Sequence, residues 1–359
     1  MLSLLFPSTH ASTPTFRTVL PVPASPSTGL RHTDGLVLLS SCFADEVGGR
    51  LTEAGHTTCI NPLGTIFNPA SLSATIARLT SESSTECFIS ADELRFDERR
   101  QVYYSFEAGT AHADEDCAAC AASINAALRA GRESLRTCAA LFLTLGSAWA
   151  YVHADGPDAA SGTVVNCHRQ PQAQFERRLL TVDETQRRVI EAIKAARAFN
   201  PSLKKVVLTV SPVRHTREGL VESSRSKAHL LAACHAACEQ QPAQVTYFPS
   251  FEILMDELRD YRWYDGEDLI HPSKPAVDYI TTRLLETHFT RDDDALRSKV
   301  IALRAAARHR HARPESAAAR AFAATQLERC RELEAAHPHL AARRTLHHEM
   351  GHFEAMASS

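Results

Sequence analysis

The sequence predicts a three-layer α/β/α fold, in which helices cover both faces of a parallel β-sheet. One observation is that the strand-like segments are continuous runs of Val, Leu and Ile, as in residues 36–39 and 204–213. Such runs are typical of strands that are buried on both faces. A second observation is that a helix-length segment follows each of these runs, as the crossover between parallel strands requires. Together they indicate an α/β domain.

The individual elements alternate along the chain. We expect strand-like segments over residues 36–39, 57–60, 140–152, 204–213 and 245–251. We expect helices over residues 44–55, 71–81, 117–137, 180–200, 226–240 and 274–289. Gly55 ends the first helix, and a Gly-Ser turn interrupts the apolar run at 140–152. Pro212 ends the strand that begins at residue 204.

Composition excludes several classes of protein. The 359 residues carry a net charge of −3, which favours neither a nucleic-acid binder nor a membrane-surface binder. The chain contains no run approaching the roughly 18 apolar residues of a membrane helix. Its start lacks a basic segment and is broken early by Pro7, so we expect no secretory signal. The 10 scattered cysteines are then expected to be reduced thiols in a cytoplasmic protein.

The composition changes along the chain and divides it into three parts. Residues 1–33 are rich in Pro, Ser and Thr and predict an extended N-terminal arm. Residues 34–291 carry the α/β pattern and predict the main domain. Residues 292–359 are rich in Ala, Arg and Glu and predict an appended segment of two or three helices with a frayed tail.

The fold class also predicts where a ligand binds. In a parallel sheet, ligands bind outside the carboxyl ends of the strands. The residues that follow the predicted strands should therefore converge; they are residues 40–42, 61–64, 146–147 and 211–212. Ser41 and Cys42 are nucleophilic side chains at the first of these ends, and a polar turn is the alternative reading of the same stretch.

A second informative stretch lies late in the chain, where Asp268 precedes His271 by three residues. A carboxylate at this spacing can accept a hydrogen bond from the imidazole Nδ1 and stabilise the charged ring. Pro272 disfavours helix at His271 and predicts a loop there. A nucleophile, a base and an orienting group are then all available, although an incidental His before a helix would have the same local sequence.

Several longer stretches resemble the GSCFA family, which belongs to the SGNH/GDSL-type hydrolase superfamily. The resemblance covers roughly residues 16–290 and includes SSCFADEVGGRL at 40–51, NPLGTIFNP at 61–69, NCHRQP at 166–171 and DLIHPS at 268–273. One departure is visible, because the Gly that opens the family motif is Ser40 in this chain.

This resemblance implies a flavodoxin-like hydrolase fold and an esterase or deacylase that works through a covalent acyl-enzyme, without metal or cofactor. When the chain is aligned with the superfamily's Gly-Asp-Ser motif, Cys42 takes the position of the nucleophile. Ser41, one residue earlier, is the alternative nucleophile. The resemblance gives His271 the role of general base and Asp268 that of orienting group. The expected substrate is a small acyl ester, such as an acylated sugar.

The resemblance also implies an oxyanion hole built from the backbone at the nucleophile, a Gly and an Asn. Gly64 is the expected Gly, whereas the turn at Gly146 lacks the Asn that the superfamily places two residues later. Asn61, Asn68 or Asn166 could replace it, or could be turn residues instead. His168 is either a substrate contact or a buried structural imidazole. Arg214, His215, Arg225 and Lys227 either bind an anionic group or form a solvated surface, which we favour.

Two other functions stay open on the same fold, namely an acyltransferase and a non-catalytic binding module. A different class is suggested by His348, Glu349 and His352, which have the HExxH spacing of zinc peptidases. We discount a zinc site there because a third ligand downstream has almost no room before the end of the sequence.

Overall fold

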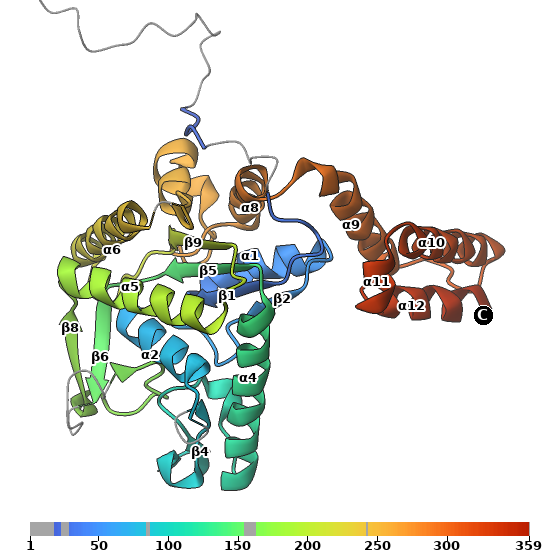
Figure 1. The fold of residues 1–359 in the computed structure, drawn as a ribbon. Helices are drawn as coiled ribbons and strands as arrows, with labels where there is room; N and C mark the ends of the chain where they lie inside the picture. Colours follow the sequence, from blue (N-terminus) through green and yellow to red (C-terminus); the bar gives the residue numbers. More distant parts are fainter. Residues whose placement is uncertain (1–17, 23–28, 84–86, 154–162, 242, 359) are drawn as a thin grey trace, which may run out of the picture.

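A parallel five-stranded sheet forms the centre of the molecule (Figure 1). The structure is a computed structural model and describes residues 18–22, 29–83, 87–153, 163–241 and 243–358. The sheet contains β1 (Leu36–Ser40), β2 (Thr58–Ile60), β5 (Ala140–Leu145), β9 (Lys205–Val210) and β10 (Val245–Tyr247). Their order across the sheet is β10-β9-β5-β1-β2 and every pair is parallel. In chain order this is 2-1-3-4-5, the flavodoxin-like arrangement.

Helices cover both faces of this sheet, as the three-layer prediction requires. One face carries α2 (Pro69–Thr80), α4 (Cys117–Thr137), α5 (Val182–Phe199) and α6 (Leu220–Gln240), and the other carries α1 (Cys42–Glu53) and α8 (Lys274–His288). Side chains of a strand alternate between the faces. Val37 and Leu39 accordingly pack with α2, α4, α5 and α6, whereas Leu36 and Leu38 pack with α1 and α8. This double burial explains the continuous apolar runs in the sequence.

The apolar run at residues 140–152 forms two strands in different sheets. The N–H groups of Gly146 and Ser147 both donate to Phe67 O, at 3.1 and 2.8 Å, and the chain leaves the main sheet at this point. It continues as β6 (Trp149–His153), which pairs antiparallel with β7 (Thr163–Val164) and β8 (Phe175–Leu179). A separate hairpin is formed by β3 (Arg95–Asp97) and β4 (Val102–Tyr104). Neither small antiparallel sheet is predicted by the sequence.

The connection between β10 and α8 has irregular helical geometry. It contains the short helix α7 (Ser250–Glu252) and a π-helix (Ile253–Leu258). Short 3₁₀ helices lie at Ala91–Glu93, Thr110–His112, Gln172–Gln174, Tyr261–Trp263 and Arg291–Asp293.

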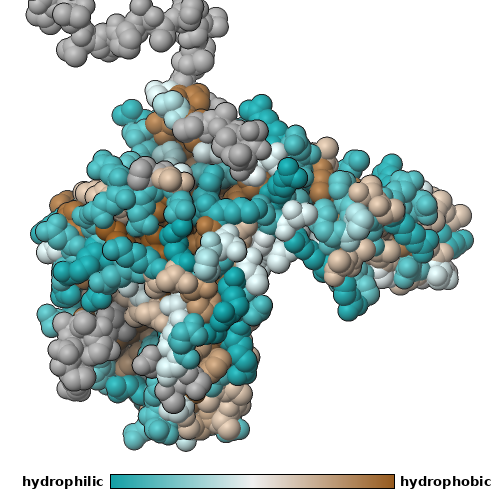
Figure 2. All heavy atoms as spheres, viewed as in Figure 1, coloured by the Kyte–Doolittle hydropathy of each residue, from teal (hydrophilic) through white to brown (hydrophobic). Residues whose placement is uncertain are grey.

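The C-terminal segment is mainly helical. It contains α9 (Asp294–Arg308), α10 (Ala317–Ala336), α11 (Pro338–Ala342) and α12 (His347–Ser358), and therefore has four helices where two or three were expected. The prediction of a frayed tail is wrong, because α12 extends to Ser358 and Phe353 is fully buried. The four helices have an apolar core of their own and project from the main body in Figure 1. The face drawn in Figure 2 is mostly hydrophilic over both parts.

The predicted N-terminal arm lies partly outside the described residues, at 1–17 and 23–28. Its described parts contact the main domain. Leu20 N donates to Glu257 in the π-helix at 3.0 Å, and Leu30 is buried and bridges to Phe289 at the end of α8. Among the described helices, none is both long and apolar enough to cross a membrane. All 10 cysteines are unpaired thiols.

Candidate active site

The order of the strands reverses between β1 and β5, and the carboxyl ends of these two strands define the site. Ser41 N donates to Thr144 O in β5 at 3.1 Å, which holds the β1 turn against its neighbour. The turn leads directly into α1, so Cys42 is the first helical residue and Ser41 is its N-cap. In a doubly wound sheet, a ligand is expected to bind at this point, where the order of the strands reverses.

Cys42 places a partly exposed thiol over the beginning of α1. The first N–H groups of a helix have no partner within the helix. Among the described residues, the N–H groups of Cys42 and Phe43 have no hydrogen-bond acceptor. Both lie close enough to the Cys42 sulfur to stabilise its thiolate form. The turn therefore combines a nucleophilic atom with two free donors.

Asp268 and His271 lie on the loop that precedes α8, as predicted. Asp268 Oδ1 accepts from the N–H of Ile270 at 2.7 Å and from that of His271 at 3.0 Å. Asp265 N donates to His271 O at 2.7 Å and closes the loop. Because the loop is held by its own backbone, the carboxylate and the imidazole keep a fixed relation to each other.

The structure brings Cys42, His271 and Asp268 into one row. Cys42 Sγ lies 3.7 Å from His271 Nε2, and His271 Nδ1 lies 2.6 Å from Asp268 Oδ2. The carboxylate accepts from Nδ1–H, which leaves Nε2 as the acceptor that faces the thiol. A thiol, an imidazole and a carboxylate in this order can act as nucleophile, general base and orienting group.

The surroundings raise the pKa of Cys42 at one end of the row and lower the pKa of Asp268 at the other. Burial and the nearby Asp45 carboxylate raise the pKa of the Cys42 thiol. The hydrogen bond from His271 and those from two backbone N–H groups lower the pKa of Asp268 to about 2. At neutral pH the thiol is therefore protonated and the carboxylate ionised, so attack by sulfur needs a base that removes the proton.

Ser41 does not share this geometry. Its side chain is fully buried, and within the described structure its Oγ has no hydrogen-bond partner. It therefore makes no hydrogen bond to His271. Of the two nucleophiles that the sequence left open, Cys42 is the one in contact with the imidazole.

Ser40 adopts the backbone conformation that the family motif meets with Gly. Its φ is 113°, in the region that favours glycine. The residue is held there by two hydrogen bonds: its N–H donates to Asn61 Oδ1 at 2.8 Å, and its Oγ donates to Ile66 O at 2.9 Å. The departure from the motif is therefore accommodated by a bond that Gly could not make.

The residues predicted for the oxyanion hole have structural partners in this conformation. Gly64 N already donates to Asn61 O at 2.7 Å, and Gly146 N donates to Phe67 O. Gly64 has a φ of 92°, and a Cβ there would lie 3.0 Å from Gly109 Cα, which explains the glycine by backbone conformation and packing. Neither N–H is available to a substrate oxygen.

The three predicted asparagines are also engaged. Asn61 links Ser40 N to Asp45 Oδ1, Asn68 caps α2 through Ser71 N, and Asn166 accepts from His168 N in a turn. These are the turn and cap functions that the sequence offered as the alternative. Asn68 and Asn166 nevertheless line a cavity beside the site.

His168 is a buried structural imidazole in this conformation. Its exposed fraction is 1%, and Nε2 lies 2.8 Å from both Ser105 O and Ala108 O. Burial lowers the pKa of this ring. These contacts tie residues 105–108 to the loop before β8.

Lys227 and His215 are the residues that sequence reasoning placed wrongly, because they were favoured as part of a solvated surface. The exposed fraction of Lys227 is 4%, and its Nζ donates to Gly146 O at 2.7 Å and to Ser211 O at 2.6 Å. The ammonium thus joins the carboxyl ends of β5 and β9, and burial lowers its pKa to about 7. The residues before Lys227 in α6, Glu-Ser-Ser-Arg-Ser at 222–226, are polar, so the local sequence contains no clear signal of this burial.

His215 lies over the turn at Gly146. A Cβ on Gly146 would lie 3.2 Å from His215 Nε2 and 3.3 Å from Ser41 Cβ, so the three residues are in close contact. Burial, followed by the positive charge of Lys227, lowers the pKa of His215 to about 3. The ring is therefore neutral, and its buried Nε2 has no partner among the described residues.

The HExxH stretch lies in α12, far along the chain from this row. Glu349 forms an ion pair with Arg304 at 3.4 Å. In the described part of the chain, no three His, Cys, Asp or Glu side chains are grouped so that they could hold a metal ion.

Comparison with known families gives a match over most of the chain. The model of the GSCFA family matches residues 35–284, which include the whole sheet, the Cys42 turn and the Asp268–His271 loop. A search of curated proteins finds no match to the chain.

Proposed function

The chain belongs to the GSCFA family, and we propose that it is an SGNH-type ester hydrolase that works through an acyl-thioester on Cys42. The observation that carries this proposal is the row of Cys42, His271 and Asp268, with its contacts of 3.7 and 2.6 Å. Three further features support it: the row lies at the switch point of the sheet, the helix N-terminus supplies two free N–H donors, and the carboxylate stays ionised.

The reaction begins with the transfer of the thiol proton to His271 Nε2. Cys42 Sγ then forms a bond to the ester carbonyl carbon, and the oxyanion is bound by the N–H groups of Cys42 and Phe43. When the C–O bond breaks, His271 returns its proton to the leaving alcohol. Asp268 holds the imidazole in the required tautomer throughout.

Deacylation repeats these steps with water. His271 removes a proton from the water while its oxygen attacks the thioester carbonyl, and the sulfur leaves with the proton as a thiol. The products are the carboxylic acid and free Cys42. If an alcohol replaces the water, the same steps transfer the acyl group, and this is the acyltransferase alternative. A small polar acyl ester such as an acylated sugar is the substrate class that we propose.

Covalent labelling tests the mechanism directly. The protein is incubated with a small activated ester, and the adduct is measured by intact mass and located by peptide mapping. The variants are Cys42→Ala, Ser41→Ala and His271→Ala. Cys117→Ala is the matched control, because Cys117 is also a partly exposed thiol at the first residue of a helix but has no His partner in the described structure.

We expect an adduct on Cys42 that is absent in Cys42→Ala, at least tenfold slower to form in His271→Ala, and unchanged in Cys117→Ala. An adduct on Ser41 would assign the reaction to a serine esterase instead. Folded wild-type protein that forms no adduct on either residue would overturn the covalent mechanism and favour a binding module.

A further inference from the structure

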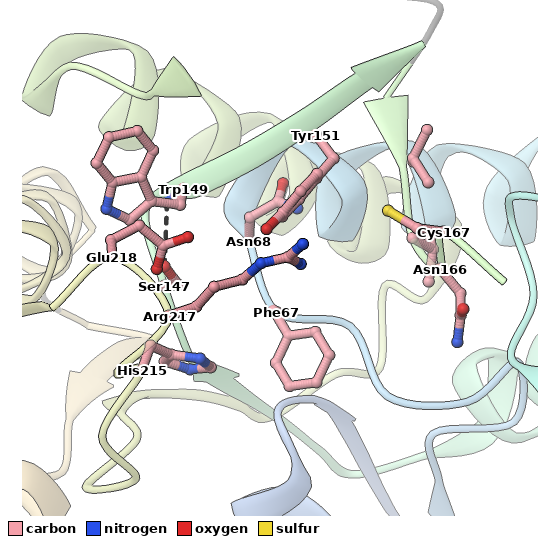
Figure 3. A pocket seen from close by; sticks show the side chains of 12 residues that line it. Phe67, Asn68, Ser147, Trp149, Tyr151, Asn166, Cys167, His215, Arg217 and Glu218 are labelled. Atoms are coloured by element: carbon pink, nitrogen blue, oxygen red, sulfur yellow. Dashed lines mark hydrogen bonds between the residues drawn. The ribbon is translucent and has the colours of Figure 1, made fainter. Parts of the chain in front are cut away.

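Two cavities lie at neighbouring strand ends beside the Cys42–His271 contact. The first, which we call the Cys42 cavity, has a volume of about 490 Å³ and is lined by Cys42, Asp45, Asp268 and His271, among others. The second, which we call the Arg217 cavity, has a volume of about 280 Å³. Its lining includes Phe67, Trp149, Tyr151, His215, Arg217 and Glu218 (Figure 3). β1 and β5 are adjacent strands, so the two cavities are neighbours.

The two cavities carry opposite charge. The Cys42 cavity is lined by five carboxylates and one lysine, which are Asp45, Glu46, Asp265, Glu267, Asp268 and Lys274. The Arg217 cavity continues into a third cavity of about 580 Å³, with which it shares Tyr151, Asn166, Cys167 and Arg217. This continuation adds Arg169 and Arg177 to the lining. An anionic group is therefore repelled from one side of the nucleophile and attracted to the other.

Arg217 is an exposed residue that lies beside an aromatic ring. Its guanidinium carbon lies 5.4 Å from the centre of the Tyr151 ring, and in Figure 3 the side chain extends between Tyr151 and Phe67. Arginine stacks on aromatic faces while its N–H groups remain free to donate at their edges.

The acidic residue of this cavity is already neutralised. Glu218 pairs with Arg177 at 3.1 Å, and Arg177 lies 5.7 Å above the Trp149 ring. Across the described ranges of the chain, no carboxylate lies within ion-pair distance of Arg217.

We propose that the Arg217 cavity binds an anionic group of the substrate, a carboxylate or a phosphate ester, through the Arg217 guanidinium. This inference rests on the proposed function, because it assigns the Arg217 cavity to the part of the ester that does not react. Arg217 is then a specificity residue rather than a catalytic one. The acidic lining of the Cys42 cavity fixes the direction in which such a substrate lies.

The test compares three activated esters that have the same acyl group. In one the remote end of the molecule is neutral, in another it carries a carboxylate, and in the third a phosphate ester. The rate of adduct formation on Cys42 is measured for wild type, Arg217→Gln and Arg217→Lys. The control is Arg187→Gln, since Arg187 is an exposed arginine on α5 that lines neither cavity.

We expect wild type to react with at least one anionic ester about tenfold faster than with the neutral ester, because charge-assisted bonds to arginine are strong. Arg217→Gln should lose this preference, and Arg217→Lys should retain part of it. Arg187→Gln should behave as wild type. The preference should also weaken as salt is added.

The outcomes separate this inference from the proposed function. If all three esters acylate Cys42 at equal rates, the anionic subsite is overturned and the cysteine mechanism stands. A preference that survives in Arg217→Gln also overturns the subsite. If none of the esters acylates Cys42, the proposed function itself fails. The carboxylate and phosphate arms show which anion the cavity takes.

Discussion

The Cys42 thiol is acted on by charges of both signs. Burial and Asp45 raise its pKa, whereas Lys227 and the N–H groups of Cys42 and Phe43 lower it. The raised pKa means that the resting thiol is protonated, so its reactivity depends on His271. Many reactive thiols reach the thiolate state without such a base because cationic surroundings lower their pKa.

Asp45→Asn should therefore make Cys42 more reactive at lower pH. Removal of the carboxylate lowers the pKa of the thiol, and the asparagine oxygen can still accept from Asn61. We expect the midpoint of the rate of Cys42 alkylation against pH to move to lower pH. Glu46→Gln is the control, since Glu46 pairs with Arg50 and should leave the midpoint unchanged. Equal shifts in both variants would argue against a specific effect of Asp45.

Ser40 provides a second test at the residue scale. Ser40→Ala loses the hydrogen bond to Ile66 O and keeps the positive φ, so we expect a loss of about 1–2 kcal/mol in the free energy of unfolding. Ser40→Gly loses the same bond but relieves backbone strain of about 1 kcal/mol or more. Urea unfolding should find Ser40→Gly more stable than Ser40→Ala. The reverse order would show that the φ of 113° carries no strain.

At the scale of elements, the loop before α8 supplies two of the three residues in the row. Arg214 supports this loop from the strand β9 side, because its N–H donates to Ile270 O at 3.1 Å and its guanidinium lies 3.9 Å above the Tyr264 ring. The loop is thus fixed both by its own backbone and by a neighbouring segment. A base that is held in this way needs little reorganisation before it accepts the thiol proton.

Asp268→Asn should disrupt the row without disrupting the loop. The amide oxygen can still accept from the N–H groups of Ile270 and His271, but the amide cannot stabilise the imidazolium or enforce its tautomer. We expect the rate of Cys42 acylation to fall at least tenfold. Asp265→Asn changes a carboxylate of the same loop that accepts from Glu267 N and not from His271. An equal loss in Asp265→Asn would mean that net loop charge, rather than the contact with His271, sets the rate.

The turn after β2 is a second element that supports the site, and Gly64 is its critical residue. Gly64→Ala forces a side chain into a φ of 92° against the Gly109 backbone, so we expect a loss of about 1–3 kcal/mol. Gly49→Ala is the matched substitution, because Gly49 lies within α1 and an added Cβ meets nothing within 4 Å. It should raise stability by about 0.5–1 kcal/mol. Thermal unfolding distinguishes the two, and a stable Gly64→Ala would show that the turn can rearrange.

At the scale of the whole molecule, a histidine cluster joins the main domain to the C-terminal helices. His32 Nδ1 lies 3.0 Å from His339 Nε2 of α11, and the His32 and His56 rings are 4.6 Å apart. Burial lowers the pKa of all three rings, for His56 to about 2. Arg297 and Arg343 add to this effect at His56, whereas the Asp293 carboxylate opposes it at His32 and His339. His337 lowers the pKa of His339 further.

This cluster makes stability depend on pH in a definite direction. A folded-state pKa below the unfolded value of 6.5 means that the unfolded chain binds more protons once the pH falls below about 6.5. The cluster therefore favours folding above that pH and disfavours it as the pH falls further. When the pH is lowered from 7 to 5, the melting temperature of His56→Leu should fall by less than that of wild type. His348→Gln, at an exposed position of α12, should follow wild type; the same loss in all three proteins would exclude a role for His56.

The sequence by itself determined the features that depend on local pattern. Continuous apolar runs marked β1, β5 and β9, and the Asp268–His271 spacing marked a pair that one short loop brings together. The short antiparallel strands were not predicted because their sequences show neither a continuous apolar run nor a regular alternation. β8 reads Phe-Glu-Arg-Arg-Leu, without the alternation of a half-buried strand, and its pairing partner β6 is set by where the chain leaves β5.

Only the tertiary structure decided which neighbouring side chain faces the site. Ser41 and Cys42 are adjacent in sequence, yet one is fully buried and the other contacts His271 across 229 positions of the chain. Asn61 and Lys227 likewise acquire their partners from packing, which made an expected oxyanion donor a structural contact and an expected surface lysine a buried one. Local spacing specifies groups within a turn or two of each other, whereas the direction of a side chain at a strand end depends on segments that arrive from elsewhere.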